Sequence, residues 1–243
     1  MRLSGFVWFN VPVLVGMSFI PNQTIALNMF FQWANQTYNA GLNYGNRNAS
    51  TPYTSSDLAQ GYIGACVASM GSAAVLRTIF AKQLKGGAGP RFILLQSVLN
   101  YISVASAGFL NCALMRYKET KDGIDVSNAK GDVIYGKSRA AGTEAVKKTG
   151  LSRAFLPIMP VCIPGVTVAL LMTMRLYPKS SQVQKIIEIS LCTAALTLGL
   201  PMSIALFKPT CILPRSAVEP ELQKILRPAG VKEVNPSTEV YDE

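Results

Sequence analysis

The chain has 243 residues and a net charge of +10, but only 15% of its residues are charged and none is histidine. That charged share lies well below the roughly 25% of soluble domains. The basic residues sit in short connections between apolar runs, which favours orientation in a lipid bilayer over binding to nucleic acid. Without histidine, and with five cysteines that form no CxxC pair, we expect neither a metal site nor a cofactor.

Five apolar segments follow one another along the chain, at residues 3–20, 58–80, 92–115, 154–174 and 186–207. A helix needs about 20 apolar residues to cross a bilayer. The fourth segment contains Pro157, Pro160 and Pro164, which a membrane bundle tolerates better than a soluble helix. The pattern predicts an all-α, multipass transmembrane bundle of about five spans. For the first segment a signal peptide is the alternative, although no A-x-A-like cleavage site follows it.

Residues 30–50, FFQWANQTYNAGLNYGNRNAS, place amides among aromatic residues. Asn35, Asn39 and Asn43 recur every four positions, so they share one face of a helix, which Gln32 and Gln36 join. An uncharged amide face suits an interfacial or cavity-lining helix, because amides both donate and accept hydrogen bonds. We expect the substrate-binding residues to be Gln32, Asn35, Gln36, Asn39, Asn43, Asn46 and Arg47. Amide contacts between helices, or glycosylation of the sequons at Asn22, Asn35 and Asn48, are the alternatives.

Polar residues gather in a loop at 116–153 and in a tail at 213–243, so we expect a transmembrane domain at 1–212 that includes the loop, followed by the tail. Within the loop, GIDV and DVIY predict two short strands around a turn. Residues 138–149 predict a polar helix that ends at Gly150, and residues 219–226 predict a short helix in the tail.

The basic residues divide unevenly if all five segments span and the connections alternate sides. Fifteen lie on the side of the loop and the tail, against eight on the side that includes Arg2. The positive-inside rule then predicts that the loop and the tail face the cytoplasm-like compartment.

The stretch at 30–50 resembles the Q-W-x-N-Q-[ST]-[FY]-N-A-x-x-N-Y-x-N-R-N-A motif of sideroflexins, the carriers of the mitochondrial inner membrane. LNCALMR at 110–116, GKSRAA at 136–141 and Pro201 resemble further family motifs in the same order, so the resemblance covers about residues 2–226. It implies a mitochondrial inner-membrane transporter of a small amino acid, serine-like, that supports one-carbon metabolism.

Other family members are tied to iron homeostasis, citrate transport or the assembly of respiratory complexes. The resemblance therefore also allows a non-transporting scaffold that binds other membrane proteins. An enzyme is disfavoured, because the chain has no histidine, no nucleophile elbow and no acidic pair in its apolar segments. The family's H-P-D-T-G-E motif, which precedes its first span, has no counterpart here, and we expect the chain to begin where that region ends.

Overall fold

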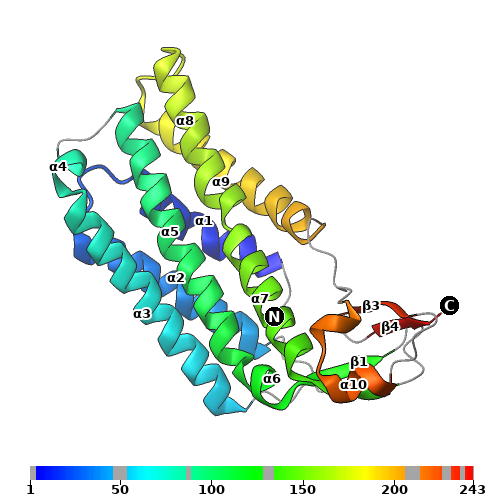
Figure 1. Ribbon diagram of the computed structural model, residues 1–243. Helices are drawn as coiled ribbons and strands as arrows, with labels where there is room; N and C mark the ends of the chain where they lie inside the picture. The colour runs from blue at the N-terminus through cyan, green and yellow to red at the C-terminus, as the bar shows by residue number, and fades with distance from the viewer. Residues whose placement is uncertain are drawn as a thin grey trace.

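The protein is a bundle of helices with a small strand-containing unit at one end (Figure 1). The structure is a computed structural model that describes residues 4–45, 54–85, 89–127, 134–205, 214–225, 231–235 and 239–242. The helices of the bundle are α1 Ser4–Phe19, α2 Ile25–Gly45, α3 Ser55–Ile79, α4 Ala81–Leu84, α5 Pro90–Met115, α7 Arg139–Phe155, the π-helical segment η1 Ile158–Cys162, α8 Ile163–Thr173 and α9 Ser181–Ala205. The remaining elements are α6 Tyr117–Asp122, β1 Ile124–Ser127, β2 Ile134–Ser138, the 3-10 turn η2 Arg215–Ala217, α10 Pro220–Ile225, β3 Val231–Asn235 and β4 Glu239–Asp242.

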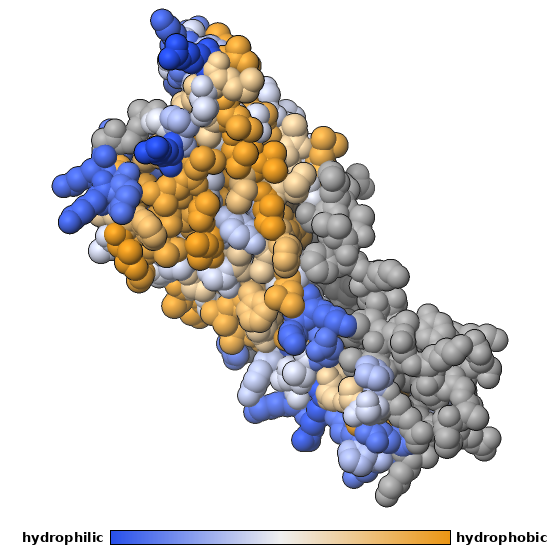
Figure 2. Space-filling view, turned by 45° about the horizontal axis from the view of Figure 1, so that its top comes forward, coloured by the Kyte–Doolittle hydropathy of each residue, from blue (hydrophilic) through white to orange (hydrophobic). Residues whose placement is uncertain are grey.

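Three helical runs of the described residues are long and apolar enough to cross a membrane: Ser55–Ile79, Pro90–Met115 and Arg139–Thr173. These runs cover the second, third and fourth predicted segments to within one residue at their ends, so the all-α multipass fold is confirmed. The first segment forms a shorter apolar helix, and the fifth lies in α9, which has 25 residues. Figure 2 shows a broad hydrophobic band on the helices, with hydrophilic residues at both ends of the molecule.

The proline-rich fourth segment keeps its helical course through a local change of geometry. Between α7 and α8 the backbone adopts one π-helical turn, Ile158–Cys162, directly after Pro157. The prediction that Gly150 ends the preceding helix is wrong, since α7 continues to Phe155. Gly150 is instead a packing position, because a Cβ there would come within 2.8 Å of the Phe109 ring of α5.

Two apolar clusters hold the bundle together. Leu14 of α1, Val161 of η1 and Leu196 of α9 belong to one of them. Phe92 of α5 and Val168 of α8 belong to the other. On α3 the residues buried at every fourth position are small or polar, which lets α3 approach α5 and α2 closely; between Asp57 and Arg77 they are Gly61, Ala65, Ser69 and Ala73.

The loop and the tail form one polar unit. Strands β1 and β2 pair antiparallel, which confirms the predicted hairpin, although its turn lies outside the described residues. Helix α10 confirms the predicted tail helix. Its Leu222, together with Val218, packs on Val126 of β1 and Ala141 of α7 in a small buried core. The tail therefore folds against the loop.

The carboxylate of Glu219 ties the tail to the first turn of α7. One of its oxygens accepts hydrogen bonds from the backbone N–H groups of Arg139 (2.7 Å) and Ala140 (3.0 Å). Burial opposes ionisation of Glu219, but hydrogen bonds from the Ser138 side chain and from these N–H groups outweigh it and lower the pKa of the carboxyl group. A negative charge at a helix N-terminus is also favoured by the helix dipole.

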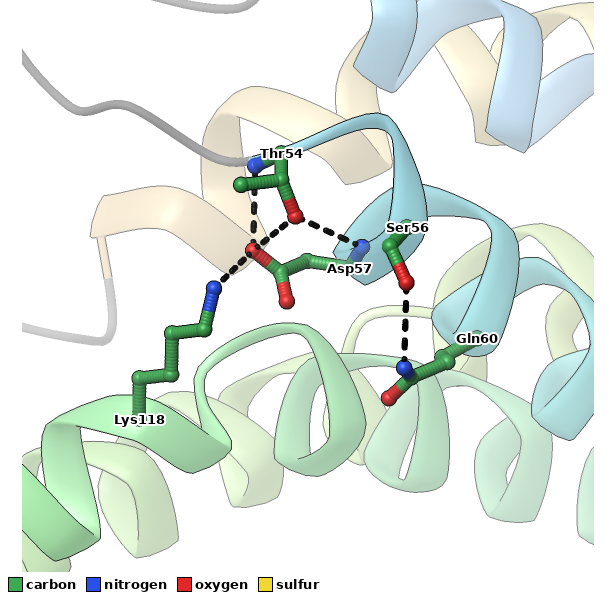
Figure 3. A network of polar contacts seen from close by, with 5 residues as sticks. All are labelled: Thr54, Ser56, Asp57, Gln60 and Lys118. Atoms are coloured by element: carbon green, nitrogen blue, oxygen red, sulfur yellow. Dashed lines mark hydrogen bonds and ion pairs between the residues drawn. The ribbon is translucent and has the colours of Figure 1, made fainter.

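Asp57 connects the loop to the start of α3 (Figure 3). It accepts from the backbone N–H of Thr54 (3.0 Å), and the Thr54 hydroxyl in turn accepts from the backbone N–H of Asp57 (3.2 Å), which completes a capping box. Lys118 of α6 forms an ion pair of 2.9 Å with the same carboxylate. The end of α5 and the start of α3 are thereby held at one end of the bundle.

Helices α1 and α2 run antiparallel through a turn at residues 20–24. The Phe9 ring near the start of α1 stacks on Tyr38 of α2 with 4.2 Å between centroids, whereas Gly16 near its end faces Phe31. Asn22 in the turn has a positive φ of 50°, a conformation that asparagine adopts more readily than most residues. The predicted alternation of five spans treated the amide stretch as a connection. Its described part, residues 30–45, is instead helical and belongs to α2 within the bundle, and the described start of α1 lies beside that helix.

Candidate functional site

The amide face of α2 points into the bundle. Gln32, Asn35 and Gln36 are buried, as is Asn28 one turn earlier. The opposite stripe is exposed, with Phe30 at 54% and Trp33 at 43%. Helix α2 is therefore polar inside and aromatic outside, the arrangement expected when the surrounding solvent is lipid.

The α1–α2 turn supplies backbone acceptors to this interior. The last four carbonyl groups of a helix have no partner within the helix. Of these, the Met17 carbonyl of α1 accepts from the amides of Gln96 (2.9 Å) and Asn100 (2.7 Å) on α5. The Gly16 carbonyl accepts from the amide of Gln23 at 2.6 Å. Side-chain amides thus provide hydrogen-bond donors for carbonyl groups that the end of α1 leaves without a partner in the helix.

Further side-chain contacts join α2 to α3 and α5. The Ser69 hydroxyl donates to Gln32 Oε1 at 2.5 Å. Asn28 Nδ2 lies 3.1 Å from Asn100 Oδ1 and 2.8 Å from Gln23 Oε1. Gln23 Oε1 also accepts from Nη2 of Arg77 at 2.9 Å. We call these residues, together with the buried Gln36 one turn after Gln32, the polar core: Gln23, Asn28, Gln32, Gln36, Ser69, Arg77, Gln96 and Asn100.

The polar core has more hydrogen-bonding groups than partners. Its buried atoms without a hydrogen-bond partner among the described residues are Asn28 Oδ1, Gln32 Nε2, Gln36 Nε2, Arg77 Nε and Gln96 Oε1. Leaving a buried polar group unpaired costs about 1–3 kcal/mol. Several such groups in one region can bind a polar ligand, because they offer donors and acceptors that the helices leave unused.

The predicted site residues are only partly brought together. Gln32 and Gln36 belong to the polar core, and Asn35 is buried next to them, which argues against glycosylation at that sequon. Asn39 is half-buried one turn further along α2. Asn46 and Arg47 lie outside the described residues, as does the side chain of Asn43.

Five members of the polar core on other elements were not predicted from the sequence. Gln96 and Asn100 stand four residues apart inside the charge-free run at 92–115, so both face the same side of α5. Arg77 is the single charge between Asp57 and the end of α3. Polar residues inside apolar segments are a signal that could have identified these positions. Gln23 and Ser69 carry no such signal, since Gln23 follows a turn and serine is common in membrane helices.

A groove of about 270 Å³ lies at the other end of α2 and does not include the polar core. Its lining is mostly apolar: Ala40, Gly41, Tyr44, Leu58, Ala59, Tyr62, Asn111 and Met115. The groove offers few groups that could orient a polar molecule.

Comparisons with known proteins agree with the motifs of the amide stretch. A family model described as Sideroflexins matches residues 1–241. The chain is similar to Sideroflexin-5 of Homo sapiens, with 36% identity over 91% of this chain and 64% of the relative. It is also similar to Sideroflexin FSF1 of Saccharomyces cerevisiae, at 34% identity over 91% of this chain and 67% of the relative. Sideroflexin-3 of Bos taurus shares 30% identity over 98% of this chain and 70% of the relative.

The chain thus spans 64% of the length of the Sideroflexin-5 relatives of Homo sapiens and Rattus norvegicus that it matches. No solved structure matches the chain.

Proposed function

The chain belongs to the sideroflexin family, and from that premise we propose that it transports a small amino acid, serine-like, across the mitochondrial inner membrane in support of one-carbon metabolism. The observation that carries this proposal is the polar core, a set of buried uncharged amides between α2, α3 and α5 with one buried arginine in the last turn of α3, inside a bundle with an apolar outer surface. Unpaired polar groups in the interior favour transport over a protein that only holds membrane partners, because such groups are costly at membrane depth and often functional.

The chemistry of the polar core suits a small zwitterion with a hydroxyl group. Amide N–H groups, such as Gln32 Nε2 and Gln36 Nε2, donate to carboxylate or hydroxyl oxygens. Amide oxygens, such as Asn28 Oδ1 and Gln96 Oε1, accept from an ammonium or hydroxyl group. Polar groups at membrane depth are expensive and often functional, which supports a ligand for these atoms.

Uptake of labelled serine into liposomes that contain the purified chain tests the proposal. The variants Gln32→Leu and Gln36→Leu each remove one unpaired donor, and Gln60→Leu changes an exposed amide on α3 as the matched control. We expect the first two to lower uptake per folded molecule by about fivefold to a hundredfold, and the control to leave uptake unchanged.

Two outcomes would contradict the proposal in different ways. Absence of uptake by the folded native chain would reject transport of serine and favour the scaffold alternative. Normal uptake per folded molecule in both Gln32→Leu and Gln36→Leu would leave transport in place but reject the amide face of α2 as the binding surface.

A further inference from the structure

We propose that Arg77 is the group that binds the carboxylate of the substrate, so the substrate class is restricted to molecules that carry a carboxylate. This inference rests on the proposed transport function and deepens it. It concerns a residue of α3, outside the amide stretch from which the site was predicted.

Arg77 is a buried cation for which the described part of the chain supplies no counter-ion. Its side chain lies in the last turn of α3 and is only 3% exposed. Among the described residues it forms no ion pair, and its Nη2 group donates a hydrogen bond to the neutral amide oxygen of Gln23. The Nε–H group has no acceptor.

The acidic residues of α3 and α9 among the described residues have other partners. Asp57, at the opposite end of α3, pairs with Lys118. Glu188 of α9 accepts from the hydroxyl of Tyr177 at 2.8 Å. No carboxylate of the described residues lies within ion-pair distance of Arg77.

A guanidinium remains protonated in proteins, so it cannot escape burial by losing its charge. An uncompensated buried charge is strongly unfavourable, whereas a guanidinium binds a planar carboxylate through two parallel hydrogen bonds. Arginine residues near the ends of membrane helices often reach lipid head groups instead. The nearly complete burial of Arg77 beneath other side chains argues against that exposed position and for an anion that enters the bundle.

The surroundings of Arg77 match the rest of an amino acid. Gln23 Oε1 accepts from both Arg77 and Asn28, and this shared acceptor fixes the guanidinium beside the Asn28 amide. The oxygen of that same amide is an unpaired acceptor. A bound α-amino acid would place its carboxylate on Arg77 and its ammonium group on the free amide oxygen, which satisfies both ends with groups that the fold leaves open.

Competition experiments in proteoliposomes test the inference on the native chain. Ethanolamine has the hydroxyl and the ammonium group of serine but no carboxylate. We expect an excess of unlabelled serine to suppress uptake of labelled serine, and ethanolamine at the same concentration to compete about tenfold or more weakly. Equal competition by the two compounds would overturn the assignment of Arg77 even if serine is transported.

Variants give a second measurement. Arg77→Met should lower uptake of serine per folded molecule by about tenfold or more, and Arg77→Lys, which keeps the charge without the planar fork, should lie between that variant and the native chain. Lys82→Met removes an exposed cation beyond the same end of α3 and should leave uptake unchanged. Native uptake in a folded Arg77→Met variant would refute the proposal. If Arg77→Met does not fold, the competition experiment on the native chain decides.

Failure of transport itself is separated from failure of this inference by a binding measurement. In detergent, serine should raise the melting temperature of the native chain but not that of Arg77→Met. Ethanolamine should change the melting temperature of neither protein. A shift of that kind without uptake would support Arg77 as a carboxylate site while rejecting transport. No shift with either compound, together with no uptake, would reject both.

Discussion

At the scale of single residues, the Gln32–Ser69 pair of the polar core is expected to stabilise the fold through one hydrogen bond between helices. The Ser69 hydroxyl donates to Gln32 Oε1 across the α2–α3 interface. Hydrogen bonds between membrane helices contribute about 0.6 kcal/mol on average and up to about 1.7 kcal/mol. We expect Ser69→Ala to destabilise the purified protein by a value in that range, measured as a lower midpoint of thermal unfolding in detergent.

A double-mutant cycle separates this pair from general loss of packing. The combination of Ser69→Ala with Gln32→Leu should destabilise the protein by less than the sum of the two single changes. Strict additivity would show that the hydroxyl and the amide do not interact, contrary to their 2.5 Å separation.

Glu219 gives the attachment of the tail a dependence on pH. The native fold lowers the pKa of this carboxyl group below its unfolded value, which is about 4.3. Its contribution is therefore fully present above the unfolded pKa and is lost as the pH falls through the lowered native pKa. We expect amide hydrogen exchange at Arg139 and Ala140, expressed as protection factors, to lose protection in that acidic window.

Glu219→Gln should remove this acid-dependent step, because a neutral amide keeps an acceptor oxygen but does not titrate. Glu221→Gln, which changes an exposed acidic residue in the first turn of α10, is the matched control and should retain the step. A step of unchanged size in Glu219→Gln would assign it to another group.

At the scale of helices, the orientation of α2 is the feature with the most consequences. Its exposed stripe includes Phe30 and Trp33, and the indole N–H of Trp33 donates to Tyr62 of α3 at 3.1 Å. In a Trp8→Phe variant, Trp33 is the only remaining tryptophan. We expect its fluorescence in proteoliposomes to be quenched by brominated acyl chains and only weakly by aqueous iodide.

The opposite result, strong quenching by iodide and none by brominated lipid, would place α2 at a water-facing surface. Its amide interior would then need another explanation, because the aromatic stripe would no longer be the lipid-facing side.

The start of α3 depends on its capping box. Thr54→Ala removes the side-chain acceptor for the Asp57 N–H, a loss that typically costs about 1 kcal/mol. Ser56→Ala, two residues later, removes only an exposed contact of 3.3 Å with Gln60 and should cost less than about 0.5 kcal/mol. Equal midpoints of thermal unfolding for the two variants would contradict a stabilising role for the cap.

At the scale of the whole molecule, the polar unit fixes the loop and the tail on the same side of the bundle. Val218 and Leu222 of the tail pack on Val126 and Ala141 of the loop unit. For the mitochondrial inner membrane that we propose as its location, the positive-inside rule predicts that this side faces the matrix. A tag inserted after Asp132 and a tag at the C-terminus should both resist protease in mitoplasts and become cleavable when the inner membrane is dissolved.

Cleavage of both tags in intact mitoplasts would reverse the orientation while leaving the fold unchanged. Cleavage of one tag alone would contradict the packing of the tail against the loop.

Local patterns in the sequence were sufficient for much of this fold. Runs of apolar residues without charge predicted the helices that can cross a membrane. The reason is that the ability of a helix to span lipid depends on its own length and composition, which a local run of sequence shows directly. The strand hairpin and α10 followed from short-range signals of the same kind. Gly150 was misjudged as a helix end, since only the neighbouring ring of Phe109 shows that the glycine serves a helix–helix contact.

The sequence alone also determined that the amides of residues 32–39 share one face of a helix, because that follows from 3.6 residues per turn. Which way the face points, and what meets it, was decided by tertiary structure. Gln23, Gln96, Asn100 and Arg77 come from a turn and two other helices, up to 77 residues apart in sequence, and no local period links them. The physical reason is that the hydrogen-bond partners of a buried polar group are the groups that the tertiary structure places within hydrogen-bond distance. Among the described residues, Arg77 and its neighbours have fewer such partners than they have donor and acceptor groups.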